Sequence, residues 1–395
     1  MAADSMEQFC VAEERSGHCA VVDGNFLYVW GGYVSIEENE VYLPNDELWI
    51  YEMDSGLWTM HLMEGELPTS MSGSCGASIN GKLYIFGGFD DKGYSNRLYY
   101  VNLRTKNGTY RWKKITNFKG QPPTPRDKLS CWEGQIFWGW HNDVHVFDTN
   151  TQTWSQPAIR GGDPPQPRAA HTCAVLGNKG YIFGGRVLQT RMNDLHCLNL
   201  DTWTWSGRIS ISGEKPKDRS WHTLTPIGDD RLFLFGGLSS DNVPLSDGWI
   251  HSITTNGWKQ LTHLPKSRPR LWHTACLGKE GEVMVFGGSK DDLHFMDTGH
   301  CSDLLIFQTQ PYSLLRDGAS TASLGNLFQC LTTLWLKNFL PVSNLKLLSQ
   351  FKAILPCPIT IHPHKQLFPI LFIRSLQALE GHNEVSPEPS LLQVE

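Results

Sequence analysis

The 395-residue sequence lacks the motifs by which many enzymes and metal-binding modules are recognised. Its ten cysteines include no Cys-x-x-Cys pair, and we interpret those that recur at related positions, Cys19, Cys173 and Cys276, as small buried apolar residues. There is no glycine-rich phosphate loop, no His-Glu-x-x-His and no Gly-x-Ser-x-Gly. We therefore expect no catalytic residues, no bound metal and no cofactor.

Excess positive charge and long apolar runs are also missing. The chain has 34 Lys+Arg against 40 Asp+Glu, a net charge of −6, which argues against a nucleic-acid partner. The apolar stretches at 324–340 and 367–373 are interrupted by charged residues or proline, so no membrane span is expected. Residues 1–14 carry acidic groups and no signal-peptide core, which predicts a cytoplasmic (cytosolic) protein, possible also in the nucleus.

Instead, the sequence repeats one pattern. Short apolar runs end in a double glycine, and in four cases a tryptophan (Trp58, Trp112, Trp205 or Trp258) follows 20 to 27 residues later. Such runs of β-branched and aromatic residues predict buried strands, and the glycines allow a turn with positive φ. The runs are Tyr28–Gly32, Tyr84–Gly88, Tyr181–Gly185, Leu232–Gly237 and Val283–Gly288.

Each repeat opens with a cluster that in its full form is Arg-x-x-His, as in Arg168–His171. The clusters begin at residues 15, 71, 126, 168, 219 and 270. The arginines and histidines recur from unit to unit, which predicts a structural role for them. A strand, the diglycine strand, an Asn-Asp-Leu-type strand and a tryptophan strand then follow, so each unit predicts four antiparallel strands.

The third unit is shorter than the others. Its opening cluster lies 42 residues before the next one, whereas the other intervals are 51 to 56 residues. Between Cys131 and Asn142 no diglycine run is present. We therefore expect an internal deletion that removed the diglycine strand, exposed apolar edges of its neighbours and lowered stability.

The repeated pattern resembles the kelch motif, whose units form the four-stranded blades of a β-propeller. The resemblance implies an all-β fold: a six-bladed kelch β-propeller, its third blade incomplete, over residues 15–310. The segment 1–14 would precede it, with Gln8–Ala12 as a possible closing strand for blade six. A divergent tail, 311–395, is expected to be partly helical or irregular, because its prolines break long helices.

Candidate binding residues stand where one repeat departs from the others. The position after the diglycine is Arg186 in the fourth unit, and its loop also carries Arg191. The next cluster has Ser220 and Trp221, and the third has Lys128 where units one, two and four have glycine or alanine. On one propeller face these groups would suit a carboxylate, which accepts bidentate bonds from a guanidinium. Ordinary solvated loop charges are the alternative.

Several of these stretches, among them Gly184–Arg186 and Arg219–His222, resemble kelch substrate receptors of cullin-RING ubiquitin ligases. Those proteins capture C-terminal degrons, typically ending in diglycine. The resemblance implies that Arg186, Arg191 and Ser220 bind the terminal carboxylate and that Lys128, Trp140 and Trp221 line the pocket. It also implies elongin B/C and cullin-5, or cullin-2, as partners.

The tail departs from that family. The adaptor-binding box of the family would place Gly318 at its cysteine position and Ala322 at its aliphatic position, a poor match for a helix. Three readings therefore remain: a receptor for C-terminal peptides, a non-catalytic kelch scaffold for folded partners, and a defective splice product that recruits no ligase.

Overall fold

The computed structural model describes residues 11–36, 39–106, 108–132, 135–137, 142–262, 264–291, 299–309 and 391–393. Within these ranges the regular structure is all β-strand, as predicted. They belong to one compact unit made of Met1–Gln310 and Pro389–Glu395. The predicted helical or irregular character of 311–388 concerns residues outside the described ranges.

Blades one and two share an eight-stranded sheet, because their outermost strands pair in parallel. In both of these blades the tryptophan of the fourth strand packs against an apolar cluster, and Trp112 is completely buried. Blade one contains β1 (Cys19–Asp23), β2 (Phe26–Trp30), β5 (Glu47–Glu52) and β6 (Leu57–Gly65), with a hairpin of β3 (Tyr33–Ile36) and β4 (Asn39–Tyr42). Blade two contains β7 (Cys75–Ile79), β8 (Lys82–Phe86), β11 (Leu98–Asn102) and β12 (Tyr110–Lys114), with β9 (Phe89–Asp90) and β10 (Gly93–Tyr94).

Blade three is smaller than its neighbours, but it has four strands in the order β13-β14-β15-β16. The sequence predicted that its second strand was deleted. In the structure the three residues of β14 take that place and pair antiparallel with β13 and β15. A short second strand therefore survives without its diglycine. The strands are β13 (Ser130–Trp132), β14 (Gln135–Phe137), β15 (Val144–Asp148) and β16 (Thr153–Ser155).

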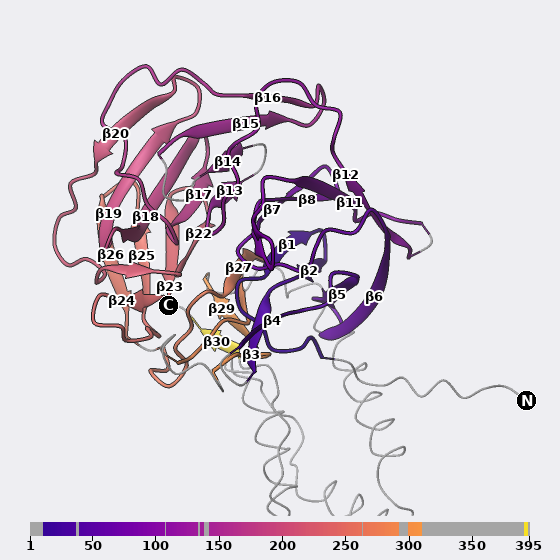
Figure 1. The fold of residues 1–395 in the computed structure, drawn as a ribbon. Helices are drawn as coiled ribbons and strands as arrows, with labels where there is room; N and C mark the ends of the chain where they lie inside the picture. The colour runs from indigo at the N-terminus through magenta and orange to yellow at the C-terminus, as the bar shows by residue number, and fades with distance from the viewer. Residues whose placement is uncertain are drawn as a thin grey trace, which may run out of the picture. The chain divides into compact units, whose positions relative to one another are not determined.

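Blades four and five show the complete repeat, and in Figure 1 β17, β18, β19 and β20 lie side by side in chain order. In blade four the second and third strands extend past the diglycine as one long hairpin. Blade four contains β17 (Thr172–Leu176), β18 (Lys179–Val187), β19 (Thr190–Asn199) and β20 (Thr204–Arg208). Blade five contains β22 (Thr223–Ile227), β23 (Arg231–Phe235), β25 (Gly248–Ser252) and β26 (Gly257–Leu261), with a short pair of β21 (Arg219–Ser220) and β24 (Leu238–Ser239).

Blade six is completed from the far end of the chain. It contains β27 (Thr274–Leu277), β28 (Val283–Phe286), β29 (Leu304–Gln308) and β30 (Leu391–Gln393), the last pairing in parallel with β29. The sequence proposed Gln8–Ala12 for this place. Val11 and Ala12 are not in a strand, Gln8–Cys10 lie outside the described residues, and the free edge of β29 is taken by β30 instead.

The innermost strands form a closed circle in which β1, β7, β13, β17, β22 and β27 each contact the next, and β27 contacts β1. At one end of this circle, the third residue of every opening cluster donates its backbone N–H to the carbonyl of the equivalent residue in the preceding blade. These six hydrogen bonds, 2.8 to 3.1 Å long, join Gly17, Gly73, Lys128, Ala170, Trp221 and Trp272 into a ring. We call it the closing ring.

Every residue of the closing ring has a left-handed backbone, with φ between +51° and +66°. This conformation is easy for glycine but costs other residues about 1 kcal/mol or more. Four of the six positions nevertheless carry a side chain. The shortened third blade takes part like the others, because Lys128 N–H bonds to Gly73 and Ala170 N–H bonds to Lys128.

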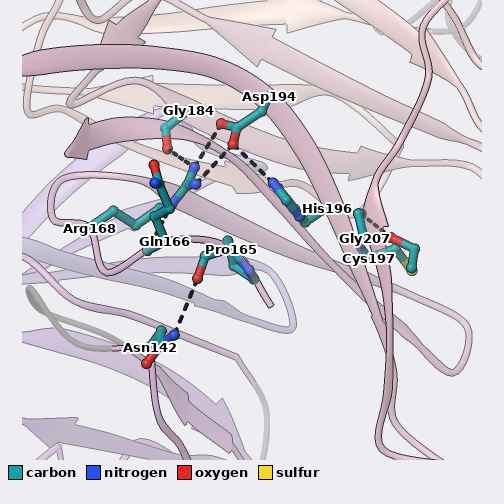
Figure 2. Close-up of polar contacts among 10 residues, drawn as sticks. Asn142, Pro165, Gln166, Arg168, Gly184, Asp194, His196, Cys197 and Gly207 are labelled. Atoms are coloured by element: carbon teal, nitrogen blue, oxygen red, sulfur yellow. Dashed lines mark hydrogen bonds and ion pairs between the residues drawn. The ribbon is translucent and has the colours of Figure 1, made fainter. Parts of the chain in front are cut away.

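The cluster arginines have the structural role that their repetition predicted. Arg168 is 1% exposed, and its Nη1 and Nη2 donate to the two carboxylate oxygens of Asp194 at 2.8 and 2.9 Å (Figure 2). Its remaining donors reach the carbonyls of Gly184 and Gln166. Equivalent pairs join Arg126 to Asp143, Arg219 to Asp247 and Arg270 to Asp303.

The cluster histidines are buried and neutral. Burial, reinforced by the adjacent arginine charge, lowers the pKa of His171 and of His273 to about 3. His273 Nε2 lies 2.9 Å from Thr223 Oγ1, and His18 Nε2 lies 2.7 Å from Thr274 Oγ1, so these rings connect first strands of adjacent blades.

Candidate functional site

The closing ring frames the mouth of a central cavity of about 210 Å³. The cavity wall consists of the ring residues and the beginnings of the six inner strands. Three ring positions carry long side chains, namely Lys128, Trp221 and Trp272. Glycine and alanine at the other three leave room for a ligand beside them.

Arg191, in the long hairpin of blade four, lies beside Trp221 of the closing ring. Its Nε donates to Ser220 Oγ at 2.9 Å, and its Nη1 donates to Asn242 Oδ1 at 2.9 Å. The guanidinium carbon lies 5.9 Å from the ring centroid of Trp221. The side chain is therefore held in one orientation by two neutral oxygens and an aromatic face, an arrangement suited to recognising an anion.

Ser220 is completely buried in β21, and its backbone pairs with Leu238 of β24. Its hydroxyl is fixed by the bond from Arg191. Trp221 follows it in the closing ring, and its indole Nε1–H is buried with no hydrogen-bond partner among the described residues. A buried donor of this kind is costly unless a ligand or water accepts from it.

Trp221 and Trp272 lie next to each other, with ring centroids 5.8 Å apart and an interplanar angle of 33°. The ammonium of Lys128 lies 5.2 Å from the centroid of Trp272 and forms a 2.7 Å ion pair with Asp127. Cations therefore stand at both ends of a pair of aromatic rings.

Arg186 is placed differently from the other predicted carboxylate ligands. It lies opposite Arg191 in the β18–β19 register, and its backbone pairs with Ala169. However, its guanidinium donates to Leu188 O and Gln189 Oε1, both at 2.9 Å, at the tip of the hairpin. The structure thus brings Arg191, Ser220 and Trp221 into contact. Lys128 is connected to them through Trp272, whereas the Arg186 guanidinium is bonded at the tip of the hairpin. Trp140 lies outside the described residues.

Sequence reasoning did not assign two of these contacts. Trp272 occupies the same cluster position as Trp221, so the rule that a departure from glycine or alanine marks the site could have found it. Asn242 lies in a loop without any repeated pattern, and only the structure reveals its bond to Arg191.

Metal-binding clusters and membrane-spanning helices are both absent from the described part of the chain. There, no group of three or more His, Cys, Asp or Glu side chains is arranged to hold a metal ion. Among the same residues there is also no helix of the length and apolarity needed to cross a bilayer.

The fold is that of a kelch-type β-propeller. Its four-stranded repeat carries a diglycine and a buried arginine, and the inner strands of the six repeats close into a circle. Comparison with known families agrees, since the model described as the KLHDC2/KLHL20/DRC7 Kelch-repeats domain matches residues 17–237. The chain belongs to this kelch-repeat family.

Among curated proteins, kelch domain-containing protein 1 of Homo sapiens is 77% identical over 345 residues, covering 80% of this chain and 85% of the relative. Kelch domain-containing protein 2 of Homo sapiens is 45% identical over 350 residues, covering 79% and 85%. A solved structure described as "Structure of YjhT" matches with a TM-score of 0.57 at 13% identity, covering 74% of this chain and 95% of that one, and supports the fold alone.

Proposed function

We propose that this chain is a non-catalytic receptor that binds the C-terminal end of target proteins, typically a diglycine end, and presents them to a cullin-RING ubiquitin ligase. The observation that carries the proposal is the fixed guanidinium of Arg191, which is bonded to buried Ser220 and lies beside Trp221 of the closing ring. A peptide carboxylate can accept paired hydrogen bonds from such a group.

The surroundings favour a small C-terminal residue. The aromatic faces of Trp221 and Trp272 form a wall at the mouth, and a diglycine end brings no side chain that would collide with it. The buried indole N–H of Trp221 is suited to donate to a peptide carbonyl. On the far side of the aromatic pair, the ammonium of Lys128 lies near Trp272, with its charge balanced by the Asp127 carboxylate.

The two arginines should contribute unequally. Arg191 is already oriented, so a ligand does not have to order its side chain. Arg186 must leave two hydrogen bonds at the hairpin tip before it can reach the mouth. We therefore expect Arg191→Ala to weaken binding more than Arg186→Ala does.

Calorimetry with a diglycine-ended peptide tests this function. Arg191→Ala should cost about 2–5 kcal/mol of binding free energy if the ion pair is desolvated. Arg208→Ala, on the exposed part of β20 in the same blade, is the matched control and should leave affinity unchanged. If amidation of the peptide's terminal carboxylate does not reduce affinity, the chain does not read a free C-terminus.

Ligase recruitment is a separate part of the proposal. Elongin B/C and cullin-5 or cullin-2 are the partners implied by the family resemblance, acting in the cytosol or nucleus. Co-precipitation of elongin with the full chain tests it. Peptide binding without elongin would indicate a receptor domain whose altered tail recruits no ligase, whereas binding of folded partners without dependence on a carboxylate would indicate a scaffold.

A further inference from the structure

Four cysteines of adjacent blades line one side of the central cavity. They are Cys19 on β1, Cys75 on β7, Cys131 on β13 and Cys173 on β17. All four are free thiols. The sequence predicts small apolar residues at the recurring cysteine positions, and that role does not explain why four thiols meet at one cavity.

Cys75 and Cys131 are related more closely than the rest. Their strands are neighbours in the inner circle, and the backbone bond from Lys128 N–H to Gly73 O, 3.0 Å long, fixes the two strands next to each other at the closing ring. Both cysteines pack in the same apolar cluster as Leu129. Burial raises the pKa of the Cys75 thiol, and the neighbouring Cys131 thiol raises it further, as expected for two sulfur groups that lie near each other.

The other two thiols of the cavity have different surroundings. Cys173 Sγ donates to the backbone carbonyl of Cys131 at 3.8 Å. Cys19 Sγ lies against Gly76, so close that a Cβ at that glycine would come within 1.9 Å of the sulfur. Cys173 is therefore directed at backbone, and Cys19 is enclosed by a neighbouring strand.

The two members of the pair differ in access to solvent. Cys75 is 7% exposed, and its burial raises the pKa of its thiol. Cys131 is only half-buried and lies on the cavity wall. A small oxidant in the cavity therefore has better access to Cys131, and Cys75, the more buried of the two, would act as the resolving thiol.

We propose that Cys75 and Cys131 form an oxidisable thiol pair that hydrogen peroxide converts into a disulfide between β7 and β13. The Cys131 thiolate attacks one peroxide oxygen, the O–O bond breaks, and a sulfenic acid and hydroxide result. The Cys75 thiol then attacks the sulfenic sulfur and loses its proton as it reacts, the S–S bond forms and a second hydroxide leaves. The two thiol protons convert both hydroxides to water, so two thiols are oxidised and one peroxide is reduced.

Such a bond would connect the shortened third blade to the second blade next to the closing ring. Because a disulfide limits the unfolded chain, oxidation should raise the melting temperature by about a few degrees. The effect would be largest for blade three, whose strands are the shortest in the inner part of the propeller.

The experiment uses the full chain, reduced and then treated with a small excess of hydrogen peroxide. Intact mass after alkylation should show one protein species with two fewer alkylated thiols, and the unalkylated protein should be lighter by about 2 Da. Cleavage after acidic residues separates the four cysteines and should give one disulfide-linked peptide pair, containing Cys75 and Cys131.

Cys131→Ser should abolish this linked pair, and Cys276→Ser, in the inner strand of blade six, is the matched control that should retain it. Comparison of reduced and oxidised wild-type protein needs no variant and is unaffected by folding defects of a substitution. The proposal is overturned if Cys131 is oxidised only to sulfinic acid, if the linkage is to Cys19 or Cys173, or if no thiol is lost.

Discussion

Blade two offers a natural template for testing the buried ion pairs. At the position of the cluster arginine it has Met71, which is 1% exposed, and at the position of the paired aspartate it has Arg97, which is exposed. Blade two has therefore lost both members of the ion pair, the arginine and the aspartate. This suggests that either charge alone is harmful, whereas removing both is tolerated.

Blade four is the place to test that reasoning. Arg168→Met leaves the buried carboxylate of Asp194 with His196 as its remaining side-chain donor, and it removes the donors to the Gly184 and Gln166 carbonyls. Asp194→Leu leaves a buried guanidinium with those two carbonyls alone. Breaking a buried pair by removing one partner costs about 3–5 kcal/mol.

Simple addition would give the double variant a cost of about 6–10 kcal/mol. We expect less, because no uncompensated charge remains, and a coupling of about 2–3 kcal/mol between the two changes is reasonable for groups in direct contact. Urea unfolding at neutral pH measures the free energy of unfolding of the wild type, both single variants and the double variant. Arg208→Met, at an exposed position of β20, is the control and should change it by less than about 0.5 kcal/mol. Strict additivity, or a harmless single variant, would refute the argument.

Three further predictions concern the rest of the propeller. Backbone amides of blade three should exchange with deuterium at least about tenfold faster than those of blade four, because β13 and β14 form short ladders; equal protection would show that blade three is as stable as its neighbours. In urea unfolding, Gly17→Ala should lower the free energy of unfolding by about 1–2 kcal/mol, since Gly17 has φ +64° and Trp272 lies 3.0 Å from the added Cβ. Ala170→Gly, at φ +53°, should be neutral or stabilising. If Ala170→Gly destabilises the protein more than Gly17→Ala does, the closing ring is not strained by its side chains. Finally, the free energy of unfolding should fall as the pH drops below about 6.5, by about 1.4 kcal/mol per pH unit for each buried histidine. The reason is that the pKa of His171 and of His273 in the folded protein is about 3, so only the unfolded chain binds their protons in this range. Unfolding curves at pH 7 and pH 5 that coincide would exclude this linkage.

Much of the propeller follows from local sequence. The apolar diglycine strands, the turns before them and the arginine clusters are all short-range patterns, and each corresponds to a repeated physical need. Even the second strand of blade three had such a signal, because Gly134-Gln135-Ile136-Phe137 resembles the turn and strand at Gly81–Tyr84. The prediction that the whole strand is absent rests on the missing diglycine alone, which is a weaker signal than this turn and strand pattern.

The closing strand of blade six could not be predicted in this way. Pairing of Leu391–Gln393 with β29 joins segments more than 80 residues apart, and a three-residue strand leaves no periodic pattern. The contact from Asn242 to Arg191 is equally non-local. Such pairings depend on which edge or donor the rest of the fold leaves available.

The closing ring connects the fold with the proposed site. A left-handed backbone is needed at all six positions for the circle of hydrogen bonds, and glycine would satisfy that need most easily. Lys128, Trp221 and Trp272 occupy such positions despite the backbone cost, and their side chains are the ones that meet at the mouth of the cavity. Non-glycine residues in strained conformations are often retained because they contribute to function. The ring therefore does more than close the propeller. Its strained positions hold two indoles, with the ammonium of Lys128 at the Trp272 end and the guanidinium of Arg191 at the Trp221 end, and these are the groups of the proposed peptide site.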